Sequence, residues 1–174
     1  MRKIVLIIIF FNFEYASAAT KIAYIDINNI LNNSIVGRAI TKHIKKIKEE
    51  KNKEFLITEN QLLDKEKDIL KKKNLLEKND LDQQVSLLKN EVNEYNILKK
   101  NFNKDVDEKK IKYTKIVLNS LNPIISKYVE ENSIDVVLPK KNIIIAKKNL
   151  DITNIIMDLL NNQLKQIDFR DEKN

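Results

Sequence analysis

The feature that most constrains the fold is a stretch of more than 80 residues, 38–122, that contains neither glycine nor proline. Glycine and proline are the residues that interrupt helices, and this stretch is instead rich in Lys, Glu and Leu. Such a composition is typical of a long helix or a coiled coil. The chain's one glycine, Gly37, stands just before it. Gly37 either lets two backbones pass closely or is simply tolerated in the first turn of a helix.

Two apolar stripes run along this stretch. In its first half, adjacent apolar pairs recur every seven residues, as Phe55-Leu56, Leu62-Leu63 and Ile69-Leu70. In its second half, single apolar residues recur at alternating spacings of three and four, with Lys99 and Lys109 as interruptions: Val85, Leu88, Val92, Tyr95, Phe102, Val106, Tyr113 and Ile116. Heptad spacing of this kind predicts helices that pack against each other in a left-handed coil.

The two stripes are similar in length, which predicts an antiparallel helical hairpin within one chain; a single unbroken helix is the alternative. The periodicity breaks in residues 71–84, and Asn79-Asp80 is the best turn signal there, because Asx residues suit turns and Asp80 can cap the next helix. Each helix of the hairpin would hold ~40 residues and measure ~60 Å at 1.5 Å per residue.

Short apolar segments on either side predict a small base. Strands are expected at residues 22–27, 134–138 and 143–146, and a final helix is expected after Asp151. Pro123 predicts a helix break, with Asn122 capping a new short helix. If the hairpin returns to its start, the three strands meet in one sheet.

The predicted fold class is therefore α+β. A long coiled-coil hairpin arm, residues 38–122, projects from a base formed by residues 19–37 and 123–168, and residues 169–174 form a tail. Three short strands leave sheet edges exposed, which predicts that the base oligomerises. The candidates for the core of the base or its subunit contact are Ile22, Tyr24, Val136, Ile143 and Ile145.

The first 18 residues have the pattern of a secretory signal peptide. A basic start, Met1 to Lys3, is followed by an apolar run and by the small residues Ala16-Ser17-Ala18. Cleavage is expected after Ala18 or after Ala19. A membrane anchor is the alternative, but it would need ~20 apolar residues.

Composition argues against catalysis. The chain has no cysteine and one histidine, His43, which lies among lysines on a predicted helix. A single glycine cannot form a glycine-rich phosphate loop, and the carboxylates alternate with lysines rather than clustering as metal ligands do. We therefore predict no enzyme, cofactor or metal site. The net charge of +7 favours anionic partners such as lipid headgroups or lipopolysaccharide, while the mixed signs argue against nucleic acid.

The sequence resembles the Skp, or OmpH-like, periplasmic chaperones over residues 21–165. The opening KIAYIDINNILNNS with Gly37-Arg38 is similar to the family's first strand and helix, and YVEENSIDVVLPKKNIIIA is similar to the strands of its base. LDITNIIMDLL matches the closing helix, with Asp151-Ile152-Thr153 as the most recognisable triplet. The Lys/Glu-rich middle is similar but unspecific.

The resemblance implies a homotrimer whose helical arms enclose a cavity. Such proteins bind unfolded outer-membrane proteins there and keep them soluble in the periplasm without ATP. Leu56, Leu63 and Leu70 are candidate client-facing residues if Phe55, Leu62 and Ile69 form the hairpin seam; alternatively both members of each pair belong to the seam. An envelope coiled-coil adaptor remains the competing function.

Overall fold

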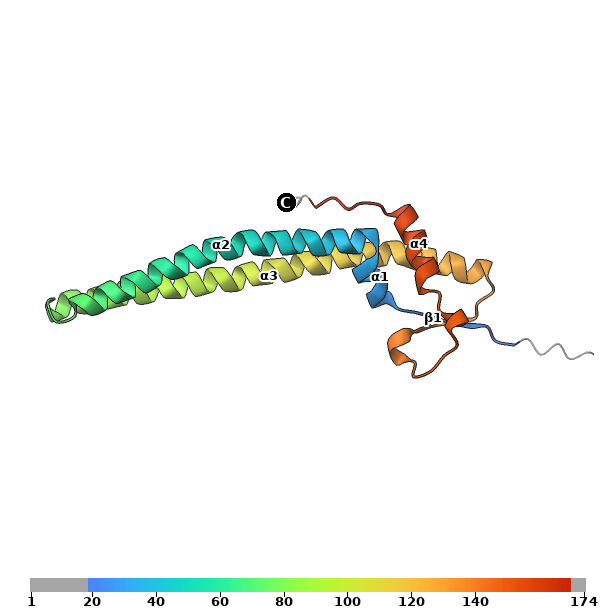
Figure 1. Cartoon of the computed structure of the whole chain (residues 1–174), viewed down its shortest axis with the longest axis horizontal. Helices are drawn as coiled ribbons and strands as arrows, with labels where there is room; N and C mark the ends of the chain where they lie inside the picture. Colours follow the sequence, from blue (N-terminus) through green and yellow to red (C-terminus); the bar gives the residue numbers. More distant parts are fainter. Residues whose placement is uncertain (1–18, 170–174) are drawn as a thin grey trace, which may run out of the picture.

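The computed structural model describes residues 19–169. The predicted signal peptide, including Ala18, lies outside these residues, and Ala19 is exposed at their beginning. The molecule is elongated: two long helices lie side by side and project from a small base, which holds the first strand, while the C-terminal segment runs back from the base along the arm (Figure 1). The predicted combination of long helices with a small sheet is confirmed.

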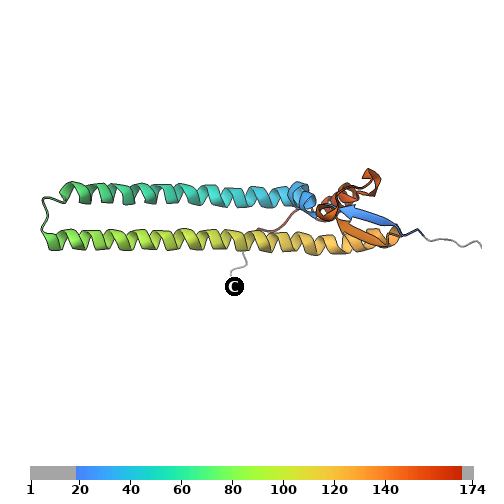
Figure 2. The ribbon, with the colours of Figure 1, turned by 90° about the horizontal axis from the view of Figure 1, so that it is seen from below.

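The arm is an antiparallel hairpin of α2 (Ile35–Lys72) and α3 (Lys78–Glu131), joined by a turn at residues 73–77 (Figure 2). The turn falls within the segment where the heptads break, but not at the predicted Asn79-Asp80. Those two residues lie in the first turn of α3 instead. A carboxylate there interacts favourably with the helix dipole, so Asp80 stabilises the start of the helix and not the reversal.

The predicted break at Pro123 is wrong, because α3 continues through it to Glu131. Proline has no N–H to donate within a helix and costs roughly 3 kcal/mol in its interior. The face on either side of Pro123 is buried, with Leu121 and Ile124 both in the core. Burial of these side chains offsets the loss of one hydrogen bond. Residue Ser133, in the left-handed conformation at φ 49°, then ends the helix.

The sheet has two strands in the described part of the chain, not three. Strand β1 (Ile22–Ile25) pairs in parallel with β2 (Val136–Pro139), with Ile22 opposite Val136. A parallel pair needs a long crossover connection, and the whole arm provides it. Residues 134 and 135, predicted as strand, precede β2 without belonging to it.

The expected third strand, residues 143–146, is a loop between two 3-10 turns, Lys140–Asn142 and Lys148–Leu150. The carbonyl of Tyr24 accepts a hydrogen bond from the N–H of Ile152 at 3.0 Å, so the second edge of β1 pairs with a later segment. Apolar composition suggested a strand there but carried no information on which edge was available.

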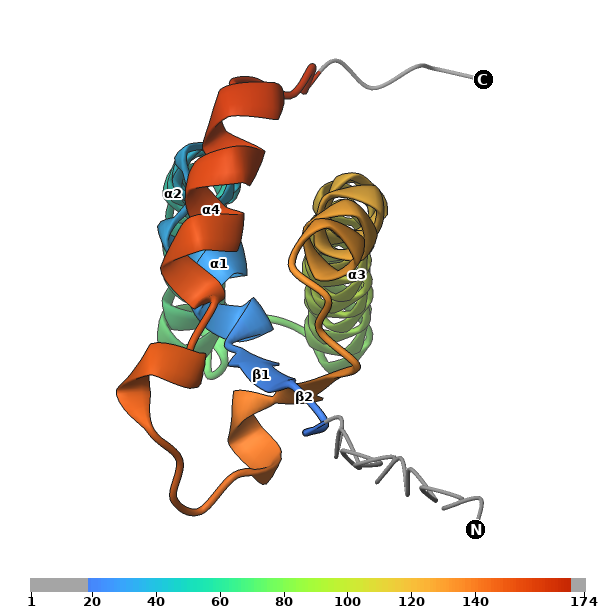
Figure 3. The ribbon, with the colours of Figure 1, turned by 90° about the vertical axis from the view of Figure 1, so that its right-hand side faces the viewer.

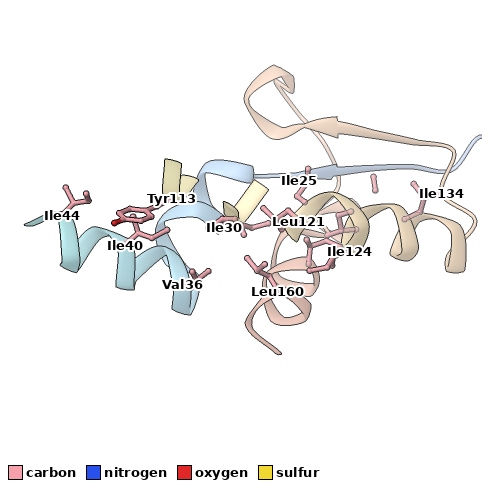
Figure 4. Packing of buried hydrophobic residues seen from close by; sticks show 14 of the residues in the cluster. Ile25, Ile30, Val36, Ile40, Ile44, Tyr113, Leu121, Ile124, Ile134 and Leu160 are labelled. Atoms are coloured by element: carbon pink, nitrogen blue, oxygen red, sulfur yellow. The ribbon is translucent and has the colours of Figure 1, made fainter. Parts of the chain in front are cut away.

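Two short helices complete the base: α1 (Ile27–Asn33) and α4 (Thr153–Gln163). Helix α4 packs against both α1 and α3 (Figure 3). The core that they share with β1 extends into the root of the arm, where Ile40, Ile44 and Tyr113 belong to the same cluster (Figure 4). The base and the first part of the arm are therefore one packed unit.

The triplet Asp151-Ile152-Thr153 ties α4 to the first strand. The backbone N–H of Asp26 donates to Thr153 Oγ1 at 2.8 Å, and the N–H of Thr153 donates to Asp151 Oδ1 at 2.9 Å. Ile152 and Thr153 are both buried. The Thr153 side chain, near the end of the chain, thus accepts a hydrogen bond from a backbone N–H near its beginning.

The chain beyond α4 returns to the root of the arm. Phe169, assigned to the tail from sequence, stacks on His43 with ring centroids 4.2 Å apart and meets Tyr113 edge-on at 5.2 Å. His43 is consequently half-buried, although the lysines around it in the sequence are typical of an exposed helix position. Two aromatic contacts of Phe169 therefore join the C-terminal segment to both helices.

Gly37 is required for a close approach. It lies in the first turn of α2, where Ser34 Oγ accepts a hydrogen bond from its N–H at 3.1 Å. A Cβ on Gly37 would stand 2.0 Å from the carbonyl oxygen of Leu31, which is far inside van der Waals contact. The side-chain-free position lets α1 turn sharply into α2.

Gly37→Ala should lower the free energy of unfolding by about 1–3 kcal/mol, because the new methyl group collides with backbone that cannot move aside. Helix propensity alone predicts the opposite, a free energy of unfolding higher by up to about 1 kcal/mol. Urea unfolding followed by circular dichroism measures the difference. A variant as stable as the wild type, or more stable, would contradict the close approach.

Candidate binding surface on the helical arm

Packing between the two helices of the arm is strongest near the base. Buried side chains at the root include Ile40, Ile44, Val106 and Tyr113. Further out, Phe55 meets Tyr95 and Phe102 edge-on, with ring centroids 5.8 and 5.5 Å apart. These three aromatic residues, called here the aromatic clasp, are the last point at which side chains between the helices are buried.

Beyond the clasp the seam is only partly closed. In residues 56–94, all of which the structure describes, no side chain is classed as buried. The seam there consists of half-buried apolar side chains at heptad spacing: Leu62, Ile69, Leu76, Leu81 and Leu88. Hydrophobic stabilisation scales with the apolar area removed from water, so the outer part of the arm is held more weakly than its root.

The second member of each heptad pair faces solvent. Leu56, Leu63 and Leu70 are 58, 50 and 63% exposed, whereas their neighbour Phe55 is buried. Of the two interpretations of these pairs, burial therefore favours a division between one seam residue and one outward residue.

An apolar groove runs along one face of the outer arm. It has a volume of about 680 Å³, and both helices contribute to it. Its apolar lining combines outward and seam side chains: Leu62, Leu63, Val85, Leu88 and Val92. Glu59, Glu66 and Lys89 stand at its edges. We call this surface the distal groove.

The opposite face of the outer arm is more polar. Lys65 Nζ lies 2.6 Å from Glu91 Oε1, which joins the two helices at the surface. Asp68, Gln84 and Glu94 lie on the same face. An exposed ion pair of this kind contributes little to stability, about 0–1 kcal/mol, so it does not replace a buried seam.

A hydrogen-bond network lies where the clasp meets the distal groove, since Glu59 and Tyr95 both line that groove. The hydroxyl of Tyr95 donates to Glu59 Oε1, and Lys99 Nζ donates to the same oxygen at 2.8 Å. These donors, Lys99 first and Tyr95 second, lower the pKa of Glu59 from its ordinary value of 4.5. Burial, followed by the bond to Glu59, raises the pKa of Tyr95, and the bond to Glu59 raises that of Lys99.

Charge is distributed unevenly along the arm. Residues 38–55 carry seven basic and three acidic residues, and residues 95–122 carry the same numbers. Residues 56–94 carry seven basic and nine acidic residues. The root of the arm is therefore strongly basic and its outer part slightly acidic.

The candidate residues of the base separate into different environments. Tyr24 is buried, whereas Ile22 and Val136 are 43 and 41% exposed in the single chain. Ile143 is half-buried, and Ile145 is 89% exposed in the loop that replaces the third strand. Ile145 is thus not part of the core of one chain; its role in a subunit contact stays a prediction.

Sequence reasoning assigned Val85 and Val92 to the seam, yet both line the distal groove with exposed side chains. In this part of α3 the seam takes one residue per heptad, Leu81 and Leu88, so the alternate stripe positions face the groove. Lys99 was read only as an interruption. Its spacing could have suggested a partner on the other helix, which proves to be Glu59.

Within residues 19–169, no helix is long and apolar enough to cross a membrane. Over the same residues, no group of three or more His, Asp or Glu side chains could hold a metal ion.

The sequence matches the family described as outer membrane protein (OmpH-like) over residues 21–160. A crystal structure of a candidate OmpH-like outer membrane chaperone from Caulobacter crescentus is similar in fold, with a TM-score of 0.75 and 21% sequence identity. That likeness covers 95% of this chain and 100% of the other. No curated protein matches the sequence at a significant level.

Glu59→Gln should remove a pH-dependent contribution to stability. Since the pKa of Glu59 is lower in the folded state, its ionised form stabilises the fold above the ordinary value of 4.5, and this contribution is lost as pH falls through the lower, folded pKa. The thermal midpoint of Glu59→Gln should thus fall below that of the wild type at neutral pH and converge with it in strongly acidic buffer.

Glu50→Gln is the matched control, because Glu50 is exposed and forms its ion pair with Lys46, one turn away on the same helix. A difference for Glu59→Gln that stays constant across the pH range would contradict the role given to the ionised carboxylate.

Proposed function

The chain belongs to the OmpH-like family, and from this we propose that it is an ATP-independent holdase chaperone of the periplasm. Its clients are unfolded outer-membrane proteins, which it keeps from aggregating on their way to the outer membrane. No cofactor, metal or enzymatic step is part of this proposal. The signal peptide at residues 1–18 directs the chain out of the cytoplasm.

The distal groove is the observation that carries the proposal. Unfolded membrane barrels expose strands in which apolar and polar residues alternate, and such strands pair with one another when left free. The groove offers exposed apolar side chains, including Leu63 and Val92, on an arm that projects away from the base (Figure 1). A shallow apolar surface binds many sequences weakly, as a holdase requires.

Leu56 and Leu70 extend the same role. They stand seven residues before and after Leu63, so they continue its line along α2, and both are exposed. Client contact by Leu56, Leu63 and Leu70 is thus supported by exposure and spacing.

The basic root of the arm adds an electrostatic component. With fourteen basic and six acidic residues in 38–55 and 95–122, it attracts acidic segments of clients at long range. The same charge would bring the molecule to anionic lipid or lipopolysaccharide.

The working form is proposed to be a homotrimer joined through the base. Exposed apolar side chains on the strands and on the following loop support subunit contact there: Ile22, Val136, Leu138, Ile144 and Ile145. Three arms projecting from one base would surround a client from several sides, which raises the effective concentration of weak contacts.

Replacing Leu63 and Val92 together by serine should weaken protection of a barrel protein diluted from urea. Roughly threefold to tenfold more chaperone should be needed for half-protection, because each partly exposed side chain contributes roughly 0.3–0.7 kcal/mol when a client covers it, and 1.4 kcal/mol is tenfold. Light scattering at increasing ratios of the chain, residues 19–174, to client measures this.

Leu87→Ser with Leu98→Ser is the matched control, since these leucines are at least as exposed as Leu63 and Val92 and line pockets on the other face. Equal effects of the two pairs would argue against a specific role of the groove. A wild-type chain that leaves the client to precipitate, yet captures one folded envelope partner, would favour the adaptor function.

A further inference from the structure

We propose that the outer arm opens along its seam and that the seam leucines, which opening exposes, form a second client-binding surface. This inference rests on the proposed function and deepens it, since it concerns how the same arm accommodates an unfolded chain. In the closed arm this surface is half-covered, and opening separates α2 from α3 beyond the aromatic clasp.

The uneven packing of the arm is the first observation. The root and the clasp hold buried side chains, while residues 56–94 are described throughout and hold none. A region with few buried apolar contacts opens locally at a lower free energy than the core to which it is attached. The turn at 73–77 joins the helices at the tip, so opening appears as bowing and rotation of the two helices rather than loss of the tip.

The aromatic clasp sets the limit of opening. Phe55 and Tyr95 are buried, and Phe102 packs edge-on against Phe55. The bonds from Tyr95 and Lys99 to Glu59 lie at the same level of the arm. Separation of the helices therefore ends there and does not reach the core of the base.

The occupant follows from continuity with the distal groove. The groove is lined both by outward side chains, such as Leu63, and by seam side chains, Leu62 and Leu88. A client segment in the groove already touches the edge of the seam, and helix separation would extend that contact inward. An unfolded strand with alternating apolar residues suits a seam whose leucines repeat along both helices.

The face opposite the groove offers little resistance to opening. Lys65 and Glu91 pair at 2.6 Å across the helices, on the face away from the groove. An exposed ion pair is weak, so it does not hold the two helices together when they separate. A covalent link at the same place would hold them together.

The test is a cross-link that prevents separation. Lys65→Cys with Glu91→Cys places one thiol on each helix outside the groove, and the natural chain has no cysteine to interfere. A short bis-maleimide reagent then locks the outer arm. About tenfold more of the locked protein than of its unlinked form should be needed to protect an unfolded barrel protein, because the open state is no longer accessible.

Two controls separate the effect of the cross-link from the effects of the substitutions and of the maleimide adduct. The same double variant without reagent tests the substitutions, and Lys65→Cys alone, blocked with a monofunctional maleimide, tests the adduct. If both protect normally and the locked arm does not, the seam is a client surface. If the locked arm protects as well as the unlinked one, the inference is overturned while the proposed function stands. If the wild type gives no protection, the proposed function itself fails.

Amide hydrogen exchange on the wild type decides the case independently of any variant. Amides in residues 56–94 should exchange at least about tenfold faster than those near Tyr113. Bound client should slow the exchange of the amides of the seam residues. Exchange in the outer arm as slow as in the core would overturn the inference.

Discussion

The packing of α2 against α3 at the root of the arm is the interaction on which the rest of the structure depends. Tyr113, Val117 and Leu121 of α3 are buried against the start of α2 and against α1 and α4, so one cluster includes both arm and base. A base of two short strands and two short helices would bury too little apolar surface by itself. The root of the arm completes the core that the base lacks.

From that root outward, fewer side chains are buried between the two helices of the arm. Side chains are buried as far as Phe55 and Tyr95, and beyond them the seam is half-open and flanked by a groove. Buried packing and accessible apolar surface therefore lie in different parts of the same two helices. A surface that stays apolar and accessible cannot also be a fully closed core, because the same leucines would have to serve both.

The sequence allowed much of this to be predicted, and the failures have identifiable causes. The hairpin followed from heptads and from the lack of glycine and proline, which are local signals. The course of α3 through Pro123 did not follow, because tertiary burial on both sides of the proline outweighed its local preference. Residues 143–146 have the composition of a strand, but pairing depends on which edge remains available, and Ile152 occupies it.

In the candidate site, the exposed leucines could be anticipated from the adjacent pairs, yet only as one of two possibilities. The position of Val85 and Val92 could not, because it depends on which of two stripe positions per heptad faces the partner helix.

The parallel pairing of β1 with β2 also bears on the order in which the chain folds. Ile22 must wait for Val136, more than 100 residues later, so the first strand to be made is among the last to be fixed. A chain of that length closes its ends slowly when it is disordered, whereas a hairpin that zips from its turn brings them together. Formation of the arm thus brings together the two strands of the base.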